Sequence, residues 1–204
     1  QESMRLRINH QDVLAMQAKG NDNNYLMVIL STAWGFMLQE MNRTEDTYYC
    51  LCMPERRASL ANMSDMAAIM DMLPMRLQCE PHHLVRDVVQ RQNSQLMLSR
   101  PYSYCHKEEL KNIVGSKGEL FQHLLSFHGF LAGTQSYSKT GDGRLGVVPV
   151  ELCSVDGKGI DLGVYFRYDG SSITVESLFN GNSFTRQEME VIMQQYAYTL
   201  HRML

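Results

Sequence analysis

The sequence predicts an α/β (α+β) sandwich, in which helices pack on a mixed, largely antiparallel sheet. Strand-like and helix-like segments are mixed along the chain, and several neighbouring strands are separated by hairpin-like connections. This order favours an open sandwich over a doubly wound parallel sheet, in which strands and helices alternate strictly. The chain has 204 residues, of which 44% are apolar and 20% are charged, so it can bury the core of one domain or large subdomain.

The first quarter of the chain contains two predicted strands and two predicted helices. Met4–Ile8 alternates apolar and charged residues, which is typical of a half-buried strand. Asn9–Ala18 is a short helix whose first residue is a good N-cap. In Asn23–Met41 the apolar spacing predicts a long helix buried over most of its circumference. Thr47–Met53 is continuously apolar or aromatic, so we expect a strand covered on both faces and ended by Pro54.

The middle of the chain is expected to contain three helices and two strands. Ser64–Met70 is predicted helical and leads through a short loop into a strand over Pro74–Cys79. Pro81–Leu98 has the pattern of an amphipathic helix, with Leu84, Val85, Val88, Val89 and Leu96 on its inner side. Lys107–Val114 is a short helix closed by a glycine, and Leu120–Phe127 is strand-like.

The last third begins with a long glycine-rich stretch, Gly129–Gly146, which predicts a long mobile loop, and loops of this length are either functional or disordered. Three strands are expected after it: Val147–Cys153, Asp161–Tyr168 and Ser172–Phe179. Asp169-Gly170 between the last two is a hairpin signal. Thr185 and Glu188 have the spacing of a capping box, which opens a final helix to Leu204.

Composition excludes several classes of function. A net charge of −3 gives no electrostatic basis for binding nucleic acid or an anionic membrane. The most apolar run, Tyr25–Leu38, has fourteen residues, whereas a membrane span needs about 20. The five cysteines show no zinc-site spacing, so we expect no bound metal and reduced thiols of a cytoplasmic protein.

The chain begins with a polar and charged segment that starts with Gln rather than Met. This segment has no apolar stretch of the kind that signal peptides contain. We therefore expect a chain that was excised from a larger protein or processed.

The stretch Met66–Arg76 carries the most informative motif. It resembles the Gly-x-Phe-(Val/Ile)-Asn-Thr-Leu-Pro-x-Arg signature of nonribosomal peptide synthetase condensation domains, and Leu73-Pro74-Met75-Arg76 matches its end. Four positions depart from the signature, namely Ala67, Ile69, Asp71 and Met72 in place of Gly, Phe, Asn and Thr. The sequence is therefore similar to a divergent member of that family.

The resemblance continues in order along nearly the whole chain. Ala33-Trp34 stands in the middle of the long helix, where the family has an Ala-Trp pair. Tyr102–Leu110 takes the place of a His-Gln-Asp-Tyr-Pro-Phe-Glu-like motif, although a Tyr stands where the His would be. Leu120-Phe121 is similar to the family's Pro-Leu-Phe segment.

The resemblance implies a chloramphenicol-acetyltransferase-like fold for the chain. Two such lobes form a V in the family, with a tunnel between them in which an acyl or peptidyl thioester is joined to an amine. The matched signature belongs to the second lobe, so residues 1–204 would be the C-terminal lobe without the N-terminal lobe that carries the catalytic motif. The resemblance then implies no catalytic residue in this chain, which should be inert alone.

The resemblance also implies site residues, cofactors and partners. Arg56, Asp71, Pro74 and Arg76 would be structural or lobe-interface residues. An arginine near Arg56 pairs in the family with the Asp of the catalytic motif across the lobe boundary, whereas the alternative for Arg56 and Arg57 is two solvated loop charges. The partners would be the N-terminal lobe, bridged by Gly129–Gly146, and carrier proteins. No cofactor is expected in the chain itself, since the phosphopantetheine arms of the carriers hold the substrates.

One histidine pair invites a different interpretation. His82-His83 with Asp87 resembles the family's catalytic His-His-x-x-x-Asp-Gly, but Val88 replaces the final Gly and the segment continues as a helix. A polar helix start is therefore favoured over a general base at His83.

Two alternatives to the condensation lobe remain open. The chain could be a non-catalytic module that docks carrier proteins or dimerises through an apolar face. It could also be a small acyltransferase with a site between subunits that uses His83.

Overall fold

The computed structural model describes residues 2–20, 23–55, 69–103, 105, 107–115, 117–128, 130 and 160–204. The elements follow in the order β1 (Glu2–Arg7), α1 (His10–Lys19), α2 (Asn23–Asn42), β2 (Asp46–Glu55), β3 (Ile69–Gln78), α3 (Val85–Ser99), the short 3₁₀ helix η2 (Arg100–Tyr102), α4 (Lys107–Val114), β4 (His123–His128), β5 (Leu162–Tyr168), β6 (Ile173–Phe179) and α5 (Arg186–Met203). No helix in these ranges is both long and apolar enough to cross a bilayer.

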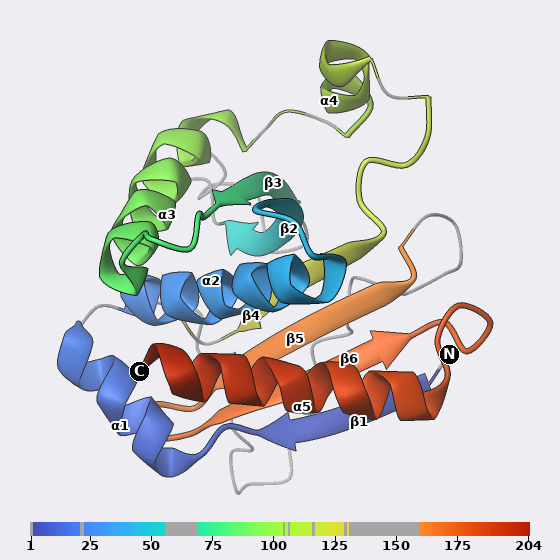
Figure 1. The fold of residues 1–204 in the computed structure, drawn as a ribbon. Coiled ribbons are helices and arrows are strands. Elements are labelled where there is room, and N and C mark those ends of the chain that lie inside the picture. The colour runs from blue at the N-terminus through green and yellow to red at the C-terminus, as the bar shows by residue number, and fades with distance from the viewer. Residues whose placement is uncertain are drawn as a thin grey trace, which may run out of the picture.

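One six-stranded sheet runs through the molecule in the order β1-β6-β5-β4-β2-β3 (Figure 1). β6 pairs antiparallel with β1 and with β5, and β2 pairs antiparallel with β3. The central strands β2, β4 and β5 are parallel to one another. The predicted α/β sandwich with a mixed, largely antiparallel sheet is therefore confirmed.

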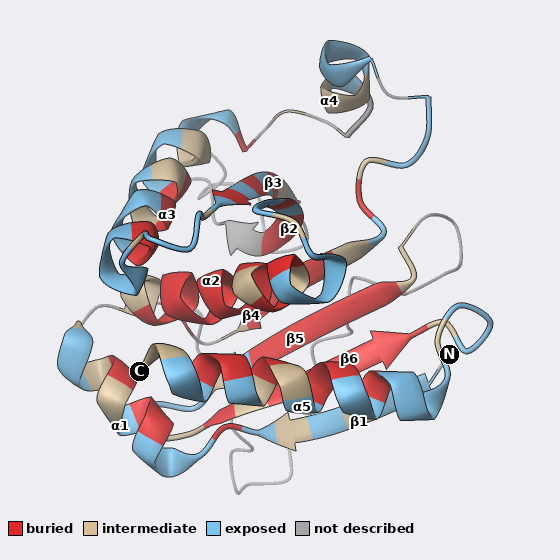
Figure 2. Cartoon of the chain, in the orientation of Figure 1, coloured by how far each residue is buried: buried red, intermediate tan, exposed pale blue. Residues whose placement is uncertain are grey.

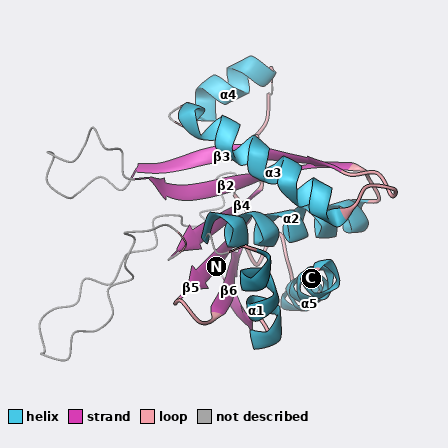
Figure 3. Cartoon of the chain, turned by 90° about the vertical axis from the view of Figure 1, so that its left-hand side faces the viewer, coloured by secondary structure: helices cyan, strands magenta, loops and turns pink. Residues whose placement is uncertain are grey.

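Helices α1, α2, α3 and α5 lie over one face of this sheet, whereas α4 stands apart beyond α3 (Figures 1 and 3). Their buried sides join alternate strand residues in one large core, among them Leu125, Phe127, Val164 and Phe166. The strand residues between these belong to smaller clusters on the opposite face, such as Cys52 with Leu124 and Tyr165 with Leu178. We call the first the helix face and the second the opposite face.

Helix α2 lies in the centre of the helix face and is buried along most of its length, as its apolar spacing predicts (Figure 2). Its buried hydroxyls are satisfied locally, because Ser31 and Thr32 donate to the carbonyl of Val28 at 3.1 and 2.7 Å. Gly35 permits close packing on the sheet. A Cβ atom there would lie 2.8 Å from Leu77 Cδ1.

Capping and turn predictions are confirmed at both ends of the chain. Asn9 caps α1 by accepting a hydrogen bond from the Gln11 amide at 3.0 Å. The Thr185–Glu188 capping box opens α5. Gly170 adopts a φ of 95° in the β5–β6 hairpin, which an L side chain rarely tolerates.

Three boundaries differ from the prediction. Ile69 and Met70 are strand rather than helix, because β3 pairs with β2 as far as Glu55. Pro54 does not end β2, since it lies beyond the stretch that also pairs with β4 and so has a strand partner on one side only. β4 begins at His123, three residues later than predicted.

Two further predictions concern α3 and the remaining segments. Leu84 and Val85 are 59% and 39% exposed rather than inward, because α3 begins only at Val85. Residues 56–68 and 131–159 lie outside the described part. They include most of the predicted helix Ser64–Met70, the predicted strand Val147–Cys153 and most of the predicted loop Gly129–Gly146.

Candidate functional site

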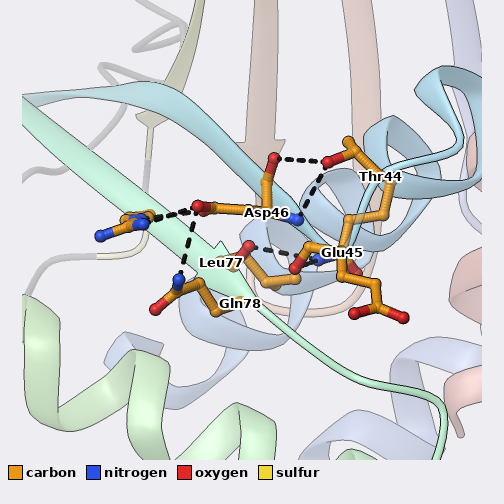
Figure 4. Close-up of polar contacts among 7 residues, drawn as sticks. Thr44, Glu45, Asp46, Leu77 and Gln78 are labelled. Atoms are coloured by element: carbon orange, nitrogen blue, oxygen red, sulfur yellow. Dashed lines mark hydrogen bonds and ion pairs between the residues drawn. The ribbon is translucent and has the colours of Figure 1, made fainter.

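Arg76, a predicted interface residue, pairs with a carboxylate of the neighbouring strand. Its Nε and Nη2 donate to the two Asp46 oxygens at 2.8 and 2.6 Å, and Gln78 Nε2 lies 3.4 Å from the same carboxylate (Figure 4). The guanidinium hydrogen bond lowers the pKa of Asp46, and the same contact raises the pKa of Arg76. Both side chains are largely exposed, so the pair fixes the strand ends more than it stabilises the fold.

The buried Gln39 fastens the end of α2 to the same strands. Its amide donates to the carbonyls of Glu45 and Leu77 at 2.6 and 3.2 Å (Figure 4). Thr44 accepts from the amide of Asp46 at 3.2 Å, which starts β2 at that residue. These contacts explain why the Asp46 carboxylate is placed opposite β3.

Side chains of α3 take the place of a further strand beside β3. Gln92 donates to the carbonyl of Arg76 at 2.8 Å. Gln95, with its amide nitrogen and oxygen assigned to satisfy both contacts, donates to that carbonyl at 2.9 Å and accepts from the Arg76 amide at 3.0 Å. The edge strand is thereby satisfied at this residue by side-chain amides.

Two of the other predicted interface residues, Asp71 and Pro74, lie in β3. Pro74 is exposed and lies opposite Cys50, where it removes one N–H from the sheet edge. The backbone of Asp71 in β3 pairs with Met53 in β2, but the Asp71 side chain is outside the described part, as is all of Arg56. The interface role of these four residues therefore stays a prediction.

His82 and His83 lie in the turn before α3, as the interpretation as a polar helix start predicted. His83 Nδ1 accepts from the Glu80 amide at 3.1 Å, and its ring is 4.6 Å from that of His82. Asp87 lies beside Arg86, with a 3.4 Å contact. The geometry is that of a capped turn.

A groove of about 970 Å³ lies between β3, α3 and α4. Its lining is mostly apolar and includes Leu73, Pro74, Leu98, Tyr102, Leu110 and Ile113. Leu98, Tyr102 and Ile113 are more than 60% exposed, at 73%, 67% and 77%. Exposed apolar surface of this kind marks a place where a partner can bind.

A second candidate site lies on the opposite face, at the carboxyl ends of the parallel strands. β2, β4 and β5 all end at the same side of the sheet, at Glu55, His128 and Tyr168. In open α/β sheets, ligands bind beyond the carboxyl ends of the parallel strands. The polar groups at this side are therefore candidates for chemistry.

One row of residues crosses the whole sheet close to these ends. The strand register aligns Arg5, Glu176, Tyr165, Ser126, Cys52 and Met72. Three of the six are charged or hydroxyl-bearing groups that are almost fully buried: Glu176, Tyr165 and Ser126. Buried polar groups need partners, so the contacts within this row define the site.

Ser126 and His128 form the first contact. They are two residues apart in β4, so both project from the opposite face. The Ser126 Oγ lies 3.1 Å from His128 Nε2. Burial lowers the pKa of His128, and the positive charge of Arg167 lowers it further. The ring is therefore neutral near pH 7.

Glu176 forms the second contact, with two arginines. Arg5 Nε donates to its Oε1 at 2.9 Å, and Arg167 Nη2 lies 3.4 Å from its Oε2. The carboxylate is 8% exposed, whereas Arg5 is 74% and Arg167 43% exposed. The two arginines therefore hold a buried carboxylate while their own ends reach solvent.

Tyr165 separates these two contacts. Its ring lies over Gly163, where a Cβ atom would be 2.8 Å from the Tyr165 hydroxyl. The ring centroid is 6.3 Å from that of His128, with the planes 28° apart. Within the described ranges no three His, Cys, Asp or Glu side chains are grouped as metal ligands would be.

This row of residues was not predicted from the sequence. A Ser-x-His pair within a strand places both side chains on one face, and that signal could have been used. Glu176 and Arg5 lie in strands that are far apart in the sequence, and only the strand register brings them together.

Comparison with known proteins gives consistent matches. The family model described as "Condensation domain" matches residues 1–204. One subunit of the linear gramicidin synthase of Brevibacillus parabrevis is 24% identical over 183 residues, which are 89% of this chain and 3% of that protein. Bacitracin synthase 3 of Bacillus licheniformis is 21% identical over 131 residues, 64% of this chain and 2% of that protein.

Solved structures share the fold at low sequence identity. The starter condensation domain of rhizomide synthetase RzmA has a TM-score of 0.63 at 12% identity, covering 99% of this chain and 44% of that one. The four-domain nonribosomal peptide synthetase AB3403 has a TM-score of 0.78 at 13% identity, covering 99% and 16%. This chain therefore spans only a few per cent of its curated relatives and less than half of a solved condensation domain.

Proposed function

The chain belongs to the condensation-domain family of nonribosomal peptide synthetases, and from this premise we propose that it is the C-terminal lobe of such a domain. The intact domain would join a carrier-bound acyl or peptidyl thioester to a carrier-bound amine. A C–N bond forms, the C–S bond breaks, and the proton lost by the amine ends on the thiolate. Without its N-terminal lobe, the chain makes no amide.

The extent of the structural match is the observation that carries this proposal. Almost the whole chain, 99%, aligns with 44% of the starter condensation domain of RzmA. The described residues form one sheet with one helix layer, as expected for one lobe of the two-lobed fold that the sequence resembles. The second lobe would then cover surfaces near the carboxyl ends of β2 and β4.

Partners and cofactors follow from the same proposal. Carrier proteins would bring the two substrates on phosphopantetheine arms, which are the only cofactor needed. Arg56, Asp71, Pro74 and Arg76 would support the contact with the N-terminal lobe, and residues 129–146 would bridge the two lobes. The free thiols of Cys79 and Cys105 suit a protein of the cytoplasm.

The test joins the chain to the N-terminal lobe of its own parent protein. Light scattering on the two co-expressed lobes should give the mass of a one-to-one complex, and the complex should form an amide from a loaded donor and acceptor. Arg56→Ala should weaken pairing, and Arg57→Ala is the matched control. A complex that fails to form, or a complex without amide product, overturns the proposal.

The groove beside α3 and α4 favours a second candidate, a non-catalytic module that docks carrier proteins. Its exposed apolar lining could accept a carrier-protein helix. In that case Leu98→Asp should abolish carrier binding by the isolated chain, whereas Tyr48→Asp on another exposed surface should not. The further alternative, an acyltransferase between subunits, requires a homodimer whose activity is lost in His83→Ala.

A further inference from the structure

The contact between Ser126 and His128 bears on which ring nitrogen of His128 carries the proton. Ser126 is 0% exposed and lies in β4, between two paired strands that engage the backbone groups around it. Among the described side chains, its hydroxyl has a hydrogen-bond contact with His128, whose Nε2 lies at 3.1 Å. With the buried hydroxyl as the donor in this contact, Nε2 accepts and the neutral ring carries its proton on Nδ1.

The surroundings keep this ring neutral and its Nδ1 available. Arg167 lies opposite His128 in the β4–β5 register, and a second positive charge on the ring would be repelled. The ring is half-buried beside Tyr165, and no described residue is hydrogen-bonded to Nδ1. Nδ1 is also not among the polar atoms that are sealed from solvent without a partner.

A neutral imidazole N–H held in this way can stabilise a developing negative charge on oxygen. Such donors act best when they are fixed before the reaction and partly shielded from water. His128 ends β4 at the carboxyl side of the parallel strands, where a substrate is expected. The neighbouring Arg167 adds positive potential, although it also binds Glu176.

We infer that His128 donates a hydrogen bond from Nδ1 to the thioester carbonyl oxygen during acyl transfer, with Ser126 as its positioning residue. This inference rests on the proposed condensation function. As the amine attacks, the C–N bond forms and the carbonyl electron pair moves onto the oxygen facing Nδ1. When the C=O bond re-forms, the C–S bond breaks, and the proton of the amine passes to the sulfur.

The experiment uses the intact two-lobed domain with loaded donor and acceptor carriers. His128→Ala should lower kcat by about 10²–10³-fold, the usual effect of removing one oxyanion donor, with the carrier KM unchanged. His128→Gln, which keeps an N–H donor, should recover part of the rate. Ser126→Ala should reduce kcat less than His128→Ala, because the donor remains but its tautomer is no longer fixed. His10→Ala, at an exposed histidine of α1, is the control and should leave kcat unchanged.

Nitrogen NMR of the labelled histidine tests the inference without relying on activity. The ring should be the Nδ1–H tautomer in the intact domain and lose this preference in Ser126→Ala. An Nε2–H tautomer, or an active wild-type domain whose His128→Ala variant keeps its kcat, overturns the role of His128 and leaves the proposed function standing. A wild-type domain that makes no amide overturns the proposed function, and the role of His128 with it.

Discussion

The two faces of the sheet differ although the same strands supply both. On the helix face, β4 and β5 present Leu125, Phe127, Val164 and Phe166 to one continuous apolar core. On the opposite face, the same strands present Ser126, His128, Tyr165 and Arg167. Ser126 contacts His128 at hydrogen-bond distance, His128 stacks near Tyr165, and Arg167 pairs with Glu176 of β6. The period of two along a strand thus separates the residues that hold the fold from the residues that could do chemistry.

This separation implies that substitutions on the two faces have different consequences. Apolar residues of the helix face should determine stability, with no direct effect on a bound substrate. Polar residues of the opposite face should affect reactivity or pH dependence more than folding. The predictions below test this difference, beginning with the largest expected change in stability.

Phe166→Ala should give the largest loss of unfolding free energy. The Phe166 ring is fully buried, stacks on Phe127 at 4.6 Å and meets Tyr196 edge-on at 5.8 Å. Truncation leaves a cavity in a close-packed core and should cost about 3–5 kcal/mol of unfolding free energy, measured by urea denaturation. Tyr48→Ala, at a side chain 63% exposed, is the control. Equal effects of the two substitutions would contradict the assignment of the core.

His123, which lies on the helix face of the sheet, should make the stability of the chain depend on pH. Burial lowers its pKa to about 4, its Nε2 has no hydrogen-bond partner among the described residues, and its ring lies 6.0 Å from that of Trp34. The unfolded chain takes up this proton near pH 6.5 and the folded chain only near 4, so stability falls as the pH drops from about 6.5 to 4. The loss from this group should approach about 3 kcal/mol, at about 1.4 kcal/mol per pKa unit.

The measurement compares unfolding free energies at pH 7 and pH 4.5 for the wild type and His123→Phe. The variant should lose stability less steeply over this interval, while the contribution of the carboxylates stays the same in both proteins. Parallel slopes for the two proteins would show that His123 is not buried as described.

Glu176→Gln should have an intermediate effect, because it changes the opposite face without creating a cavity. The substitution removes the charge that Arg5 and Arg167 share, but both arginines reach solvent and are not stranded. We expect a loss of about 1–3 kcal/mol, typical of a hydrogen bond to a charged group. Chemical denaturation should compare Glu176→Gln, which weakens the contacts with both arginines, with Arg5→Gln, which removes only the Arg5–Glu176 pair. A loss of unfolding free energy as large as that of Phe166→Ala would contradict the proposed difference between the two faces.

The features that depend on local sequence were predictable, and those that depend on strand register were not. The apolar spacing of α2 and the Thr185–Glu188 box are properties of neighbouring residues, and both predictions were confirmed. The apolar, Met-rich segment around Ile69 and Met70 was predicted helical, but pairing with β2 overrides that preference. In the same way, Ser126–His128 could be derived from two positions of one strand, whereas Glu176 with Arg5 required the whole sheet.

The smallest effect should come from the ion pair on the signature strand. Arg76→Gln removes a bidentate contact with Asp46, but both side chains are exposed and water replaces the partner. We expect no measurable change in the unfolding free energy of the chain, with Asp46→Asn as the matched variant. In the intact domain, the same Arg76→Gln variant should weaken pairing of the lobes if Arg76 is an interface residue, as the family signature suggests. Unchanged pairing would leave the arginine as a surface charge of β3 and restrict the candidate lobe contact to Arg56, Asp71 and Pro74.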